Sequence, residues 1–406
     1  MIVRRFLLWA RTAGAGQRAE AVEALARAYL ATPLSPEDRW EAETALTAML
    51  DDPSPLVRRS MAHALADAPD APRPVVVALA NDQSDIAALV LSRSPVLTDA
   101  DLIDCAALGD DLVQTAVALR RRVSIPVAAA LAEIAAPVAL TALADNPGAD
   151  IPASAFRRLL ERHGADATVR ESLLKRPDLP LETRQAVAAA VARTLSDFVV
   201  GCGWLSRERS ERVTREAREK ATVALSAEAA VADVQRLVAH LRASAQLTPA
   251  LLLRAILSGN LAFAAAALAD LTSLPLRRVV GLMGDRKGAG FAALYGRAGL
   301  PAGLRVAFET AVRALHEVAP GEPPLTGAHL SRRMIGRVLS ACADLPPEET
   351  GKLTAMLRRF EVEAAVEEAR ETAGALADEA ALDFMLEHDP HALIDVFSVP
   401  GVRTAA

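Results

Sequence analysis

Residues 284–290 (GDRKGAG) form the stretch of the chain that most resembles a phosphate-binding loop. Gly284, Gly288 and Gly290 would let backbone N–H donors approach an anion closely, and Arg286 and Lys287 would add positive charge. The context differs from that of a nucleotide-binding loop, because a helix is expected before it and Lys287 is followed by glycine instead of Ser or Thr. Two interpretations stay open: a glycine-rich turn between two helices, or an anion-binding loop that senses a small molecule.

Three arginine clusters could hold phosphates or an acidic helix, provided that they share one face of the protein. Arginine runs can equally be solvated faces, or last turns of helices whose charge complements the helix dipole. Stacked helical repeats can bring such distant positions onto one surface. The clusters are Arg120, Arg121 and Arg122; Arg157 and Arg158; and Arg332, Arg333 and Arg337.

The other reactive residue types form no recognisable catalytic set. The chain has neither a Gly-x-Ser-x-Gly nor a His-Glu-x-x-His sequence. His388 and His391 have the right chemistry for a metal, but Pro390 prevents the helical spacing that would align them. Cys105 is expected on an apolar helix face as inert packing, and Cys202 in a small interdomain hinge. We expect no cofactor and no metal, and we favour a non-enzymatic role.

The composition predicts that helices carry these residues. Hydrophobic residues make up 52% of the 406 residues, but aromatic residues only 3%, so Ala, Leu and Val supply most of the apolar surface. Ala and Leu favour helices, whereas the residue types typical of sheets are thin. The length exceeds what one hydrophobic core usually covers. The sequence therefore predicts an all-α fold, with either two domains or one elongated solenoid.

Local signals for helix ends agree with this fold. Ser35, Ser54 and Thr248 each precede a proline, which places a side-chain cap before a residue suited to the first helical turn. Gly164 and Gly259 stand where a left-handed cap would end a helix. Further helices are expected at residues 206–225, 249–258, 276–283, 304–318 and 329–342, with a flexible loop at residues 320–324.

Turn-like steps recur along the first half of the chain. They lie roughly 28 to 35 residues apart, which is the length of one helix-turn-helix repeat. Each is followed by a new apolar-periodic stretch, and such a unit buries its apolar stripe only by stacking on its neighbours. The steps are at residues 51–53, 81–82, 109–110, 145–147 and 177–178.

The predicted organisation has four parts. An N-terminal helix or cap occupies residues 1–34, and a HEAT-like α-solenoid of helix pairs occupies residues 35–195. A second helical domain follows at 196–345. Residues 346–406 are expected to form an acidic tail with a helix or two, loosely attached, which could fold back on a basic groove.

Charge and targeting signals narrow the functional classes. The formal net charge of −6 and the pI near 5.8 disfavour an electrostatic grip of the whole protein on nucleic acid. Three widely spaced cysteines fit a reducing compartment. The apolar stretch at residues 6–10 is too short for a signal peptide, and no run is long enough for a transmembrane span. We expect a cytoplasmic protein, with contact of residues 1–11 with a membrane surface as the lesser alternative.

Several stretches resemble an uncharacterised bacterial family, domain of unknown function 2336. The first half carries residues 52–66 (DPSPLVRRSMAHALA), 94–103 (SPVLTDADLI) and 146–151 (NPGADI). The second half carries residues 284–291 (GDRKGAGF) and 297–301 (RAGLP). The resemblance spans residues 35–345 and implies HEAT-like or leucine-rich-variant helical repeats. It implies no activity, and no catalytic residue is carried over.

A looser likeness connects the chain to HEAT-like DNA glycosylases, which act on damaged bases from a basic concave surface with aromatic residues. This chain departs from that pattern, because it is acidic and Trp9, Trp40 and Trp204 do not cluster with the arginines. The leading hypothesis is a scaffold that binds a protein or peptide partner, of unknown identity, on its concave repeat surface. A nucleic-acid-binding or base-processing protein is the alternative, and a small-molecule sensor at residues 284–290 is the third hypothesis.

Overall fold

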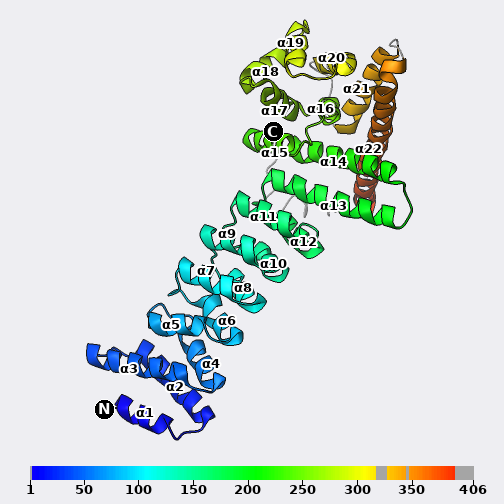
Figure 1. Ribbon diagram of the computed structural model, residues 1–406. Coiled ribbons are helices and arrows are strands. Elements are labelled where there is room, and N and C mark those ends of the chain that lie inside the picture. The colour runs from blue at the N-terminus through cyan, green and yellow to red at the C-terminus, as the bar shows by residue number, and fades with distance from the viewer. Residues whose placement is uncertain (1, 317–326, 344–346, 389–406) are drawn as a thin grey trace. The chain divides into compact units, whose positions relative to one another are not determined.

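The computed structural model describes residues 2–316, 327–343 and 347–388, which form two compact units (Figure 1). Unit 1 ends at Thr214 and unit 2 begins at Arg215. Across the described ranges the regular elements are helices, apart from one isolated bridge between Val123 and Ala149, so the all-α prediction is confirmed. None of these helices is long and apolar enough to cross a bilayer. The loop expected at residues 320–324, and His391, lie outside the described residues.

Unit 1 consists mainly of short helices that follow one another closely. A last helix, α14 (Arg207–Ala227), crosses from unit 1 into unit 2. The others are α1 (Ile2–Ala10), α2 (Ala15–Ala31), α3 (Pro36–Ala48), the 3-10 turn η1 (Met49–Asp51), α4 (Pro55–Leu65), α5 (Arg73–Ala80), α6 (Ser84–Arg93), α7 (Asp99–Leu108), α8 (Asp111–Ala118), α9 (Ile125–Ile134), α10 (Pro137–Asp145), α11 (Ala153–His163), α12 (Ala167–Lys175) and α13 (Leu181–Gly201).

Successive helix pairs of unit 1 lie side by side in two rows (Figure 1). In the even row, α4 packs on α2 and α6, α8 packs on α6 and α10, and α12 packs on α10. In the odd row, α9 packs on α7 and α11, and α13 packs on α11. Contacts along the even row are the more extensive. The arrangement is consistent with the expected stack of helix pairs.

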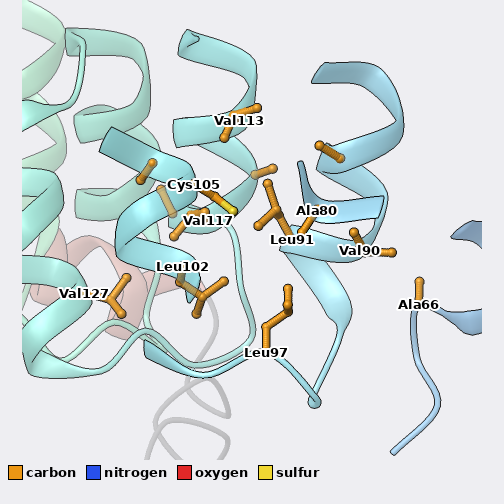
Figure 2. Packing of buried hydrophobic residues seen from close by; sticks show 14 of the residues in the cluster. Ala66, Ala80, Val90, Leu91, Leu97, Leu102, Cys105, Val113, Val117 and Val127 are labelled. Atoms are coloured by element: carbon orange, nitrogen blue, oxygen red, sulfur yellow. The ribbon is translucent and has the colours of Figure 1, made fainter. Parts of the chain in front are cut away.

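One continuous cluster of buried apolar side chains runs through unit 1, from Ala19 of α2 to Leu179 before α13. Figure 2 shows part of it, where Leu91 of α6, Cys105 of α7 and Val117 of α8 meet. Burial of one Leu or Val side chain contributes about 1.5–3 kcal/mol. Because each pair buries its apolar stripe against the next, no pair is stable alone. Cys105 belongs to this core, as the sequence indicated, and burial raises the pKa of its thiol.

Two of the three predicted helix starts carry the expected side-chain cap. The Ser35 hydroxyl accepts a hydrogen bond from the Asp38 backbone N–H (3.1 Å), and the Thr248 hydroxyl accepts one from the Leu251 N–H (3.0 Å). Ser54 also precedes its helix, but its side chain makes no cap hydrogen bond. The proline that follows each of the three residues then fixes the first turn.

The two predicted helix stops differ. Gly259 follows α16 in the left-handed region (φ 74°), as expected. Gly164 also follows the last residue of its helix, α11, as expected, but the left-handed conformation predicted for it is wrong, because this residue stays right-handed (φ −64°). A Cβ atom there would collide with the backbone oxygen of Leu160, so glycine is needed for close approach and not for its φ angle.

In unit 2, α16 (Pro249–Leu257) packs against helices that are distant in the sequence, and it is buried at every position from Leu251 to its end. Four helices expected from the sequence, α16, α18, α20 and α21, lie where they were predicted. The other elements are α15 (Val231–Ala243), α17 (Leu261–Thr272), α18 (Leu276–Met283), α19 (Ala289–Arg297), the 3-10 turn η2 (Ala302–Leu304), α20 (Arg305–His316), α21 (Gly327–Cys342) and α22 (Pro347–His388).

The acidic segment was expected to be loosely attached, and for its first half this expectation is wrong. α22 is a single helix of 42 residues that packs along α21. Its inner face buries Leu353, Leu357, Phe360 and Ala364, which are spaced as one helical stripe. Its acidic residues pair with basic side chains of unit 2. These ion pairs explain why the segment predicted to be a loose tail packs against unit 2. Residues 371–381 of the same helix are exposed.

Candidate binding sites

The first arginine cluster begins with a residue that joins two neighbouring helix pairs. Arg120 follows α8, and its guanidinium donates hydrogen bonds to the backbone oxygens of Leu91 and Ser94 (2.7 Å to Ser94) at the end of α6. The last carbonyls of a helix have no partner in their own helix, so this contact caps α6. Burial lowers the pKa of Arg120. Arg121 and Arg122, beside it, are exposed.

The same capping contact recurs along the chain, and the sequence did not reveal it. In each case an Arg or Asn side chain donates to backbone oxygens near the end of a helix about one helix pair away. Arg162 reaches Ala132 (2.7 Å) and Ala135 (3.2 Å), Arg176 reaches Ala144, Asn146 and Ala149 (2.8 Å to Asn146), and Asn146 reaches Ala118 and Arg120 (2.7 Å to Arg120). In unit 2, Arg242 reaches Asp270 (3.0 Å) and Arg297 reaches Thr272 (3.1 Å).

The second arginine cluster lies on another row of helices. Arg157 and Arg158 project from α11 in the odd row, whereas Arg120 caps a helix of the even row. The Nε atom of Arg158 lies 2.7 Å from a carboxylate oxygen of Glu133, and Arg157 lies 3.9 Å from Glu161. In the third cluster, Arg332 pairs with Glu368 of α22 at 2.8 Å. Within unit 1, the first two clusters therefore lie on different rows of helices.

The glycine-rich loop connects α18 to α19, as the turn interpretation predicted. Two of its backbone donors are already occupied, because the Asp285 carboxylate accepts hydrogen bonds from the N–H groups of Gly290 (2.8 Å) and Lys287 (3.0 Å). These bonds lower the pKa of Asp285. Gly288 adopts a left-handed conformation (φ 77°) at the start of α19. Since the loop's own aspartate binds these two N–H groups, the side chains of the loop are the groups best placed to bind an anion here.

Such side chains gather in a cavity of about 240 Å³ between this loop and α20. Arg286 and Lys287 come from the loop, and Arg313 and His316 from the last turn of α20. Of the three other charged groups of the lining, Arg305 and Glu309 pair with each other at 2.7 Å, and the Asp285 carboxylate binds the loop backbone. The cavity therefore has a basic character.

An exposed apolar row lies at one edge of unit 1. Leu108 and Ile134 end α7 and α9, and Leu112 and Val138 lie in the first turns of α8 and α10. Leu108 is 87% exposed and Val138 is 54% exposed. α7 starts at residue 99 and α9 at 125, and α8 starts at 111 and α10 at 137, so the two pairs hold equivalent positions. Because these helices stack, the four side chains form one row, which we call the apolar edge.

Acidic residues flank the apolar edge on one helix pair. Asp104 of α7 and Asp111 of α8 are exposed and lie beside Leu108 and Leu112 in the sequence. By contrast, Thr115 and Thr141, midway along α8 and α10, have small side chains whose hydroxyls bond to carbonyls of their own helices. The edge therefore offers a partner more apolar contact area than the middle of the even row does.

The sequence also places this fold in a known family. A protein-family model described as an uncharacterised protein conserved in bacteria (DUF2336) matches residues 86–348, well over half of the chain. The chain belongs to this family. The DUF2336 match begins in α6, later than residue 35, where the resemblance was expected to start. No curated protein and no solved structure matches the chain. The apolar edge and the basic cavity both lie within the DUF2336 region.

Proposed function

We propose that residues 35–195 form a HEAT-like solenoid that serves as a cytoplasmic, non-enzymatic scaffold for a protein partner. The observation that carries this proposal is the apolar edge, where equivalent positions of successive repeats expose large aliphatic side chains. Contiguous exposed apolar surface commonly marks an interaction site. The arginines that suggested other chemistry are partly used in capping and in ion pairs.

The side chains in and around the apolar edge indicate what kind of partner would bind it. An amphipathic helix presents apolar side chains at i, i+3, i+4 and i+7, and it can lay them along a row such as Leu108, Leu112, Ile134 and Val138. Since Asp104 and Asp111 flank the row, basic residues beside the partner's apolar stripe would increase specificity and the association rate. The expected partner is a basic amphipathic helix.

A peptide library displayed on phage tests this proposal directly. Selection on the purified full chain should enrich sequences with an apolar stripe at helical spacing and flanking Lys or Arg. A double variant, Leu112→Asp with Val138→Asp, should weaken the selected peptides at least tenfold in fluorescence anisotropy. Leu376→Asp, at an equally exposed leucine of α22, is the matched control and should leave affinity unchanged. Equal loss in both variants would contradict the proposed surface.

The nucleic-acid alternative makes an opposite prediction. Arg121, Arg122 and Arg157 are exposed, and a DNA or RNA ligand held by them would bind with steep salt dependence. Reversing the three charges with glutamate should then abolish binding of duplex DNA while peptide binding persists. Absence of salt-dependent DNA binding at low ionic strength would leave the scaffold as the better account.

The basic cavity beside α20 supports a second candidate function, sensing of a small anion. Arg286, Lys287, Arg313 and His316 could bind a phosphate-bearing molecule through their side chains. A thermal-shift screen with nucleotides and sugar phosphates should show a melting temperature that rises with ligand concentration. Arg313→Ala should remove that rise. A panel that produces no shift would count against this site.

A further inference from the structure

Unit 2 contains a second cavity, of about 300 Å³, formed by residues of α14, α16, α21 and α22. This volume lies at the lower end of the range for small-molecule sites, which are mostly apolar with a few polar groups that fix orientation. Much of the lining is apolar. It includes Val223, Leu257, Ile335, Phe360 and Ala364.

Arg254 is a charged residue of this lining that is unusual because it is buried. Its side chain is only 7% exposed, and the guanidinium carbon lies 3.8 Å from the centre of the Phe360 ring. One nitrogen, Nη1, donates a hydrogen bond to Glu363 of α22 at 2.6 Å. The other two nitrogens, Nε and Nη2, are buried and have no hydrogen-bond partner. Buried donors of a charged group without an acceptor are unfavourable, so an acceptor is missing from this site.

The geometry of the unpaired atoms indicates what that acceptor is. Nε and Nη2 form one edge of the planar guanidinium, and two N–H groups on one edge match the two oxygens of a carboxylate. Glu363 is bound on the opposite side through Nη1 alone. Stacking on Phe360 holds the guanidinium plane in place.

The remaining charges near Arg254 restrict the ligand further. Lys220 is paired with Glu367 at 2.9 Å, and Glu371 also lines the cavity. Close by, Glu219 accepts a hydrogen bond from Thr248, and burial raises the pKa of its carboxyl. With so many carboxylates nearby, a singly charged anion fits better than a phosphate dianion.

We propose that this cavity binds a small molecule with one carboxylate and a compact apolar body. The carboxylate binds the Nε–Nη2 edge of Arg254, and the apolar body packs against Leu257, Ile335 and Phe360. Because Nε and Nη2 are shielded from solvent, the lining side chains, including Glu363, shift to admit the ligand. This site is separate from the apolar edge and from the basic cavity beside α20, so its failure leaves the scaffold proposal untouched.

A panel of short aliphatic and aromatic monocarboxylic acids, each matched with its primary amide, tests the proposal on the full chain. Thermal shift and isothermal titration at neutral pH should identify acids that bind with Kd below about 1 mM, and the matched amides should bind at least tenfold more weakly. If no acid binds in this range, or if acids and amides bind equally, the carboxylate assignment is overturned.

Two variants locate the binding. Arg254→Lys keeps the charge but loses the planar edge, and it should weaken acid binding at least tenfold. Ala224→Phe changes an exposed residue of the lining and should block the cavity by bulk, which keeps the test valid if the Arg254 variant is unstable. Arg313→Lys in the other cavity is the control and should leave acid binding unchanged. Unaltered binding in Ala224→Phe would overturn the location.

Discussion

The polar contacts inside unit 1 and those inside unit 2 join residues at very different separations along the chain. In unit 1 the ion pairs between separate segments connect residues about one helix pair apart. Examples are Arg58 with Asp82, Arg73 with Asp101 and Arg18 with Asp52, which are 24, 28 and 34 residues apart. In unit 2 the pairs made by α22 include Arg332 with Glu368, Arg254 with Glu363 and Lys220 with Glu367, which are 36, 109 and 147 residues apart.

This difference has a thermodynamic meaning. When each repeat contacts only its neighbours, stability is approximately a sum of local and nearest-neighbour contributions, and damage stays local. Unit 2 instead depends on its last helix returning to α14 and α16, so its packing is completed only when α22 is in place. We expect unit 1 to open in parts and unit 2 to open as a whole.

The largest effects should come from removing a buried phenylalanine in each unit. Phe156 of α11 and Phe263 of α17 are both fully buried, so Phe156→Ala and Phe263→Ala should each cost about 3–5 kcal/mol. In hydrogen-exchange experiments, Phe156→Ala should reduce protection mainly in α9 to α13, whereas Phe263→Ala should reduce it across unit 2. Loss of protection reaching α4 in the first variant, or confined to α17 in the second, would break the comparison.

Removing one repeat-to-repeat cap should have the next largest effect. Arg176 is buried and donates to the backbone oxygens of Ala144, Asn146 and Ala149. Arg176→Met leaves these acceptors without their donor and should lower the free energy of unfolding by about 3 kcal/mol in urea titrations. Arg157→Met, at an exposed arginine of the same unit, should change it by less than about 0.5 kcal/mol. Similar values for both variants would show that the caps contribute little.

The sequence predicted the parts of this fold that depend on neighbouring residues. The caps at Ser35 and Thr248 and the helix ends at Gly164 and Gly259 are local signals, and each helix follows from its own apolar stripe. The left-handed conformation predicted for Gly164 was wrong because glycine is needed there for steric contact with Leu160, which a cap pattern does not reveal. The role of Arg120 was missed because its acceptors are backbone oxygens, which every residue carries.

The candidate sites were harder to predict because they depend on contacts between residues that are far apart in the sequence. The basic residues of the loop at 284–290 were visible in the sequence, but their partners on α20 come from a separate helix. The row formed by Leu108 and Ile134 requires knowing which positions of two helices are equivalent. Arg254 and Glu363 are 109 residues apart, and no local pattern links them.

A carboxylate in unit 1 should show a moderate, pH-dependent effect. Asp52 is buried and accepts two hydrogen bonds from Arg18, at 2.7 and 2.8 Å, and these bonds lower the pKa of its carboxyl. A lowered pKa in the folded state stabilises the fold above the ordinary aspartate value of 3.8, and the contribution is lost as the pH falls through the folded-state pKa. Asp52→Asn should therefore cost about 2 kcal/mol at neutral pH and progressively less in acid. A constant difference at all pH values would contradict this assignment.

The smallest effect should come from the exposed contacts of α22. Glu368 accepts a hydrogen bond from Arg332 and lies 2.6 Å from His329, and Arg332 contributes most to lowering the pKa of its carboxyl. By the same sign argument, the contact weakens as the pH falls below the ordinary glutamate value of 4.5. Glu368→Gln should increase hydrogen exchange in α22 at neutral pH without moving the unfolding midpoint of unit 1, whereas Glu379→Gln, on the exposed stretch, should change neither. If α22 exchanges at the same rate in wild type and Glu368→Gln, the Arg332–Glu368 pair does not help to attach the helix, which then rests on the apolar stripe from Leu353 to Ala364 and on the pairs of Glu363 and Glu367. The Arg332–Glu368 pair would then add specificity to unit 2 without adding stability.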